Sequence, residues 1–140
     1  MKPIIEYQNY RQYIADYYEY KKRTSAFSWR EFAKRSGFTN PVYLKQICDG
    51  KYNLGESAVP RVGEAMELAG FELTYFKILV QFNHAKTDVE KKKFFEDLQS
   101  IAKVHKVKVL GGTGIHLQLF LKQITGCTAY QYIFIFVFAE

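Results

Sequence analysis

The chain is poor in cysteine and proline, and it has no long apolar run. It contains two cysteines and three prolines in 140 residues. Cys48 and Cys127 are too few for a disulfide framework and stand at no metal-ligand spacing, so a reducing cytoplasm is the expected location. The longest apolar run, residues 133–139, is far shorter than the roughly 20 residues of a membrane-spanning helix. The composition therefore predicts neither a disulfide-stabilised secreted domain nor a membrane protein.

Residue patterns of catalytic and cofactor sites are also missing. His84, His105 and His116 are scattered, with no cysteine or carboxylate at ligand spacing. The glycine-rich stretch 111–114 lacks the Lys-Ser/Thr pair of a phosphate-binding loop. The first residues contain no apolar segment of the kind that a secretory signal needs. We therefore expect no enzyme, no metal, no cofactor and no signal peptide.

Helical periodicity is the dominant pattern of the sequence. Hydrophobic residues make up 48% of the chain, which is enough for a core, and they recur at three- and four-residue steps over the first hundred residues. This pattern predicts an all-α fold with a five- or six-helix bundle. Lysine and valine alternate at 106–110 like a short strand, and residues 130–138 are β-prone. We expect a helical domain at 1–105 and an irregular or β-prone appendage at 106–140.

Tyrosine is concentrated near the start of the chain. Six of the eleven tyrosines precede Lys21. A helical stripe is formed by Tyr7, Tyr10, Tyr13, Ile14, Tyr17 and Tyr18. Such a stripe could stack on nucleic-acid bases. It is more often a core face whose hydroxyls reach the surface, and we prefer that interpretation.

A short second helix is expected to start at Ser28 and to stop before Gly37. Ser28 and Glu31 have the spacing of a capping box, in which each side chain accepts a hydrogen bond from a backbone N–H at the helix start. Gly37 stands where many helices end in a residue with left-handed backbone.

A third short helix is expected at about 40–49. Thr39 is the candidate N-cap, Pro41 fits the first turn, and Gly50 ends the helix. Its apolar face consists of three residues at i, i+3 and i+4: Leu44, Ile47 and Cys48.

Three more helices are expected further along the chain. The fourth starts near Ser57, because Pro60 is tolerated only in a first turn. The fifth covers about 72–85. The sixth opens with a second capping box and covers about 87–104.

Positive charge is concentrated in one segment. The chain has a net charge of +6, and the segment from Tyr20 to Lys51 holds all of it, with eight basic and two acidic residues. A concentrated basic region suits a polyanion, because binding to phosphates releases counterions. A merely solvated basic surface is the alternative.

The second and third expected helices have the arrangement of a helix-turn-helix motif. Helices this short are not stable alone, so they must pack across the turn and against the other helices. The outward face of the third helix then consists of Val42, Lys45, Gln46 and Asp49, with Tyr43 on its flank and Asn40 at its start. Asn, Gln and Lys are side chains that read base edges in the major groove.

Two sets of residues resemble known proteins. One set resembles the lambda-repressor-like (Cro/repressor type) helix-turn-helix domain: Phe32, Ala33, Gly37, Phe38, Thr39, Leu44, Ile47, Gly50, Lys51, Leu54, Val62, Ala65 and Leu68. The other set is similar to a group of uncharacterised bacterial proteins with an N-terminal helix-turn-helix region and a longer C-terminal domain, and it includes residues 10–13, 27–33, 50–54 and 82–87. This resemblance implies a transcriptional regulator.

The resemblance also implies where DNA would bind. Five residues become candidates for contacts to bases in the major groove: Asn40, Val42, Tyr43, Lys45 and Gln46. Five others become candidates for contacts to phosphates: Ser28, Arg30, Lys51, Tyr52 and Asn53. Domains of this kind usually act as dimers on two-fold sites, so double-stranded DNA and a second copy of the chain are the implied partners.

Two other interpretations stay open at this point. The helices could form a packed bundle that binds no DNA, or a protein-interaction adaptor that uses the tyrosine-rich first helix and the fifth helix. Residues 113–140 do not resemble the C-terminal domain of the uncharacterised group, which predicts a shortened or altered C-terminus.

Overall fold

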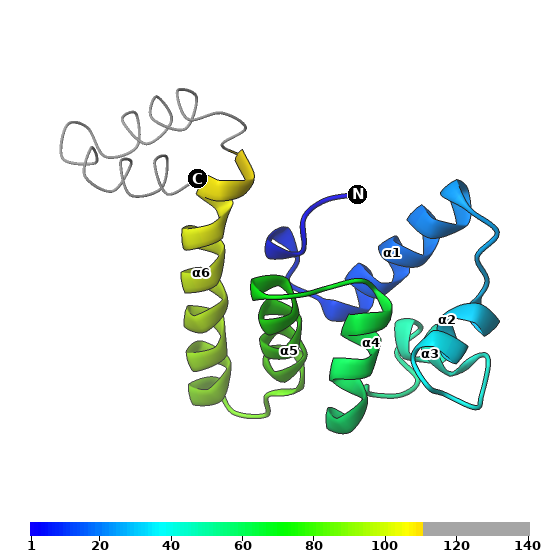
Figure 1. The fold of residues 1–140 in the computed structure, drawn as a ribbon. Coiled ribbons are helices and arrows are strands. Elements are labelled where there is room, and N and C mark those ends of the chain that lie inside the picture. Colours follow the sequence, from blue (N-terminus) through cyan, green and yellow to red (C-terminus); the bar gives the residue numbers. More distant parts are fainter. Residues whose placement is uncertain (111–140) are drawn as a thin grey trace. The chain divides into compact units, whose positions relative to one another are not determined.

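All regular secondary structure in the described part of the chain is helical. The structure is a computed structural model that describes residues 1–110, with side chains as far as His105 (Figure 1). Its elements are η1 (Ile4–Glu6), α1 (Tyr10–Thr24), α2 (Trp29–Arg35), α3 (Tyr43–Cys48), η2 (Glu56–Ala58), α4 (Val59–Ala65), α5 (Phe71–His84) and α6 (Asp88–Leu110). The all-α prediction is confirmed over these residues. The predictions for 130–138 and for an altered C-terminus lie outside them.

Residues Met1–Gln99 form one compact unit, and the rest of α6, from Ser100 onward, belongs to a second. The expected domain boundary near residue 105 remains a prediction. None of the helices described here is long and apolar enough to cross a membrane.

Helix α1 supplies an aromatic core face. Asn9 caps its start by accepting a hydrogen bond from the Arg11 N–H over 2.9 Å. All six residues of the predicted stripe are buried, which confirms the core interpretation, but Tyr7 lies in extended backbone before α1 and not on the helix. Their hydroxyls reach partners at the rim, as when Tyr7 donates to the Asp16 carboxylate over 2.6 Å. The ring of Tyr18 stacks on that of Trp29 with centroids 3.9 Å apart, which joins α1 to α2.

The N-terminal segment and α5 are tied together by buried polar contacts. The Tyr75 hydroxyl lies 3.2 Å from the Ile5 carbonyl and 2.8 Å from the Tyr7 carbonyl, and it donates to both. The Tyr10 N–H donates to Asn83 Oδ1 over 2.8 Å. These bonds satisfy backbone groups that would otherwise be buried without partners.

Helix α2 begins where the capping pattern predicts, but only half of the capping box forms. Ser28 Oγ accepts a hydrogen bond from the Glu31 N–H over 3.2 Å. The Glu31 carboxylate instead pairs with Arg35 one turn later, with 3.1 Å between Oε1 and Nε. An i,i+4 pair on the helix surface therefore replaces the second capping bond.

Helices α2 and α3 both end in the same way. Gly37 has φ +78° and Gly50 has φ +85°, the left-handed backbone that glycine adopts without strain. The Gly37 N–H donates to Lys34 O and the Phe38 N–H to Ala33 O. The Gly50 N–H donates to Ile47 O and the Lys51 N–H to Gln46 O in the same pattern. Both ends are therefore Schellman motifs, as the two glycines predicted.

The prediction for the start of α3 is wrong by about three residues. The helix starts at Tyr43, and Thr39 does not cap it. Asn40 Oδ1 instead accepts from the Val42 N–H over 3.0 Å, so that Asn40, Pro41 and Val42 form a separate turn before the helix. The Asn side chain makes this turn favourable without any helical continuation.

The later helices agree with expectation except at the end of α6. Pro60 lies in the first turn of α4, and α5 matches its predicted range within one residue at each end. The Glu90 N–H donates to Thr87 Oγ1 over 3.2 Å at the start of α6. The strand expected at 106–110 is wrong, because α6 continues to Leu110. Extending an existing helix adds one hydrogen bond per residue, which outweighs the β preference of valine.

Candidate nucleic-acid interface

Helix α3 is fixed on one side and open on the other. Leu44 and Ile47 are completely buried, whereas Val42 is 45% exposed, Lys45 is exposed and Gln46 is half-buried. Cys48, predicted to share the inner face, is half-buried. The side of α3 that carries Lys45 is therefore not covered by any described part of the chain.

Two of the predicted base-contacting residues also have structural partners. The Asn40 side-chain oxygen accepts from the Val42 N–H, which leaves its NH₂ group available as a donor. The Tyr43 ring meets the Phe38 ring edge to face, with centroids 4.9 Å apart, and it lies 5.9 Å from the Tyr52 ring. Tyr43 thus belongs to an aromatic cluster beside α3 and presents only part of its surface to solvent.

Arg11 holds the C-terminal end of α3 and the turn after it. Its guanidinium donates to Ile47 O over 2.7 Å and to Tyr52 O over 2.8 Å through Nη1, and to Asn53 Oδ1 over 2.6 Å through Nη2. A cation at this position also complements the negative end of the helix dipole. No pattern in the sequence predicts this role, although Arg11 lies within one of the segments that carry the resemblance.

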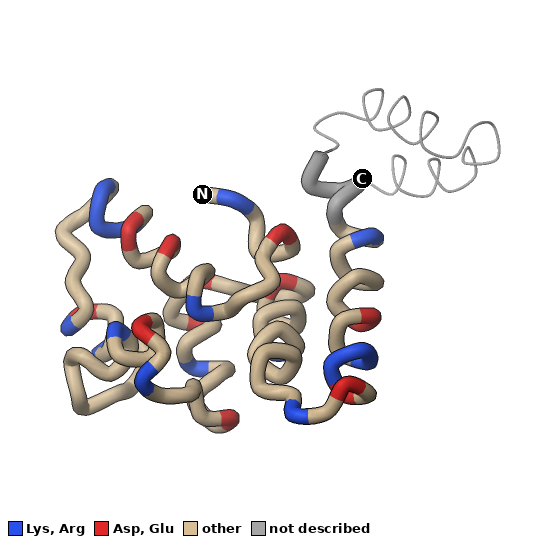
Figure 2. Tube along the Cα trace, turned by 180° about the vertical axis from the view of Figure 1, so that it is seen from behind, with Lys and Arg blue, Asp and Glu red and all other residues tan. Residues whose placement is uncertain are grey.

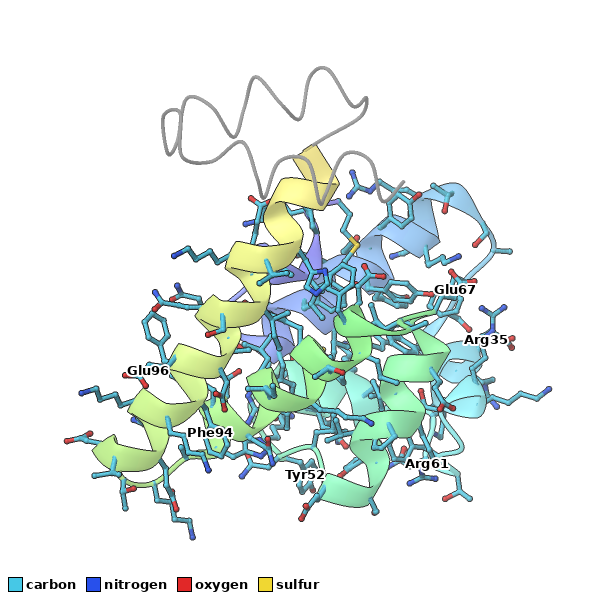
Figure 3. All side chains as sticks on the ribbon, turned by 60° about the vertical axis from the view of Figure 1, so that its left-hand side comes forward. Arg35, Tyr52, Arg61, Glu67, Phe94 and Glu96 are labelled. Atoms are coloured by element: carbon cyan, nitrogen blue, oxygen red, sulfur yellow. The ribbon has the colours of Figure 1, made fainter. Side chains whose placement is uncertain are left out.

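The predicted phosphate-contacting residues lie at two places on the surface. Ser28 and Arg30 are exposed at the start of α2, and Lys51, Tyr52 and Asn53 are exposed in the turn after α3. Ser28 Oγ is used as the α2 cap, and Asn53 Oδ1 accepts from Arg11. Arg30 and Lys51 are the two cations of this set. Tyr52, which follows Lys51 in the sequence and is labelled in Figure 3, is 53% exposed.

Other cations of the basic segment surround this region. Figure 2 shows blue positions at the end of α1, in α2 and in α3, and red positions also lie in α1 and near α2 and α3. Lys21 pairs with Glu67 at 3.4 Å, and Arg35 pairs with Glu31 at 3.1 Å. Lys22 and Lys34 are exposed and form no ion pair within the described residues. The segment therefore keeps exposed positive charge after its internal pairs are counted.

Nucleophilic or metal chemistry has little support near α3. Burial, and then the neighbouring Asp49, raise the pKa of the Cys48 thiol to about 12, so that it stays protonated at neutral pH. No three His, Cys, Asp or Glu residues within the described chain are grouped so that they could hold a metal ion.

The chain shows no significant similarity to a protein-family model, to a curated protein or to a solved structure. Any functional conclusion therefore rests on the residues of the chain itself.

Proposed function

We propose that the chain is a transcriptional regulator that binds double-stranded DNA through a lambda-repressor-like helix-turn-helix formed by α2 and α3. One observation carries the proposal. Leu44 and Ile47 anchor α3 in the core, while the opposite side, with Lys45 at its centre, faces solvent within a net-positive segment. This is the arrangement that a helix inserted in the major groove requires.

In this proposal, α3 and the turn before it read base edges. Lys45 donates to guanine O6 or N7, the amide of Gln46 pairs with adenine, and the NH₂ group of Asn40 donates to an acceptor on a base edge. Val42 and the exposed edge of Tyr43 supply apolar contacts, such as contact with a thymine methyl group. These five residues form the proposed base-reading set.

Phosphate contacts set the position of α3 in the groove. Arg30 at the start of α2 and Lys51 after α3 are the cations of the predicted set, and Ser28, Tyr52 and Asn53 add polar groups beside them. Contacts of this kind orient a protein on DNA without reading its sequence. A second copy of the chain, bound to the second half of a two-fold site, completes the proposal.

The alternative is a helical adaptor that binds proteins and not DNA. It loses support from the described structure, because the tyrosine face of α1 that it would use is buried in the core. The fifth helix also buries Tyr75, Phe76, Leu79 and Val80. The side of α3 that carries Lys45 is exposed instead.

Titration of the full chain with DNA at several salt concentrations tests the proposal. Sites selected from a random pool would provide the specific duplex, and an unrelated duplex would provide the reference. We expect the logarithm of the binding constant to fall by about 0.9 per phosphate contact per logarithmic unit of salt. An absence of DNA binding at low salt would reject this function and leave the adaptor.

A further inference from the structure

A cavity of about 510 Å³ lies within the Met1–Gln99 unit, away from the exposed side of α3. Its apolar walls come from four parts of the chain: Leu54 after α3, Val59 in α4, Val80 in α5 and Phe94 in α6. Of these residues, Phe94 is labelled in Figure 3. This volume is within the range of binding sites for small organic molecules. The lining of such sites is mostly apolar and includes a few polar groups.

The polar groups of the cavity have both signs of charge. Lys77, Gln81 and His84 lie on one face of α5, at i, i+4 and i+7. Glu56 of η2 and Glu90 of α6 contribute carboxylates to the same cavity. Within the described chain, neither carboxylate forms an ion pair with Lys77, so each charge can meet a ligand group.

His84 is held by a hydrogen bond to Tyr10. The Leu54 N–H donates to Tyr10 Oη over 3.3 Å, and Tyr10 Oη lies 2.9 Å from His84 Nε2. Tyr10 Oη and His84 Nε2 are therefore joined by one hydrogen bond, which occupies Nε2 and leaves Nδ1 as the other ring nitrogen. Burial, and then the charge of Arg11, lower the pKa of His84, so the ring is neutral at pH 7. His84 is therefore a polar group that adds to the Lys77 ammonium on the α5 side of the cavity.

We propose that this cavity binds a small zwitterion with an apolar body, the chemistry of a free apolar or aromatic amino acid. The ligand carboxylate lies on the α5 side, against Lys77 and His84. The ligand ammonium lies toward Glu56 and Glu90, and the apolar body contacts Val80 and Phe94. This inference does not depend on DNA binding.

Three matched probes test the charge arrangement. L-phenylalanine has both charges, 3-phenylpropionate has only the carboxylate and 2-phenylethylamine has only the ammonium. Calorimetric titration of the full chain should show phenylalanine binding most tightly, with each single-charge probe about three- to tenfold weaker. Equal binding of all three, or no binding of phenylalanine at millimolar concentration, would overturn the proposal.

Two variants assign the charges to their partners. Lys77→Met should weaken phenylalanine and 3-phenylpropionate and leave 2-phenylethylamine unchanged. Glu56→Gln with Glu90→Gln should weaken phenylalanine and 2-phenylethylamine and leave 3-phenylpropionate unchanged. Lys92→Met and Asp88→Asn, which alter exposed charges that do not line the cavity, are the controls.

The pattern of losses decides the result. A loss of binding for all probes in both variants, or for none, would contradict the assigned roles. Because these titrations contain no DNA, their failure leaves the proposed DNA function untouched. Failure of DNA binding likewise leaves this site standing.

Discussion

The guanidinium of Arg11, in the first turn of α1, donates to the main-chain carbonyl of Ile47, in the last turn of α3, over 2.7 Å. Two residues 36 positions apart in the chain are thereby joined by a charge-assisted hydrogen bond. Two further bonds, to Tyr52 O and Asn53 Oδ1, extend the contact to the turn after α3. A six-residue helix such as α3 has little stability of its own, so its position depends on contacts of this kind.

Arg11→Ala should destabilise the fold. We expect a loss of about 1–3 kcal/mol in the free energy of unfolding, because the acceptors lose a charged donor. Urea unfolding followed by fluorescence of Trp29, the single tryptophan, measures it. Arg11→Lys, which cannot make the same forked contacts, should lie between Ala and wild type. Wild-type stability in Arg11→Ala would show that the contact does not hold α3.

Lys45→Ala and Gln46→Ala should each weaken binding to the selected DNA site by about 1–3 kcal/mol. Binding to unrelated DNA should change little, since the lost contacts are to base edges. Fluorescence anisotropy titrations with both duplexes provide the comparison. Lys34→Ala, an exposed lysine of α2 outside the proposed set, is the matched control. Equal losses on both duplexes would reassign these residues to phosphate contacts.

Gly50→Ala should cost about 1 kcal/mol of stability through backbone strain alone. Gly50 has φ +85°, and no atom lies within 4 Å of an added Cβ, so no steric clash contributes. Gly55→Ala is the control, because its surroundings are equally open and its φ is not positive. Thermal unfolding of the two variants gives the difference. If they are equally stable, the Schellman end of α3 does not contribute as described.

Stability should decrease as the pH falls from about 7 to 5.5, because of His84. Its pKa is lowered in the folded chain by burial and by Arg11. The unfolded chain, with a His pKa of about 6.5, therefore binds the proton first, and protonation favours unfolding. The slope of unfolding free energy against pH should flatten in His84→Gln. An unchanged slope in this variant would assign the pH dependence to other groups.

The features that were predicted best from the sequence depend on interactions between residues close together in the chain. Ser28 caps α2, Gly37 and Gly50 end their helices, and Leu44 and Ile47 point into the core because each of these outcomes is set by residues within a turn or two. The predicted start of α3 was wrong because the Asn40 side chain accepts a hydrogen bond from the nearby Val42 N–H and forms a turn. Residue spacing alone does not distinguish such a turn from the first turn of a helix.

Features that depend on distant residues were not predictable in this way. The partners of Arg11 lie 36 to 42 positions away, and the cavity is lined by segments that only the fold brings together. No periodic pattern marks either of them. The exposed positions of α3 followed from the helical period, since its buried face defines its outer face. The helical period does not indicate which ligand those positions bind.

A glycine with positive φ lies on each side of α3: Gly37 ends α2 before it, and Gly50 ends α3 itself. The position of this segment depends on these glycines, on Leu44 and Ile47, and on Arg11, whereas the side chains of Lys45 and Gln46 form no hydrogen bond or ion pair within the described residues. The residues at the exposed positions of α3 can therefore be substituted together while its buried residues stay unchanged. A library randomised at Val42, Lys45 and Gln46 should yield mostly folded proteins, so that new nucleotide preferences could be sought at small cost in foldability.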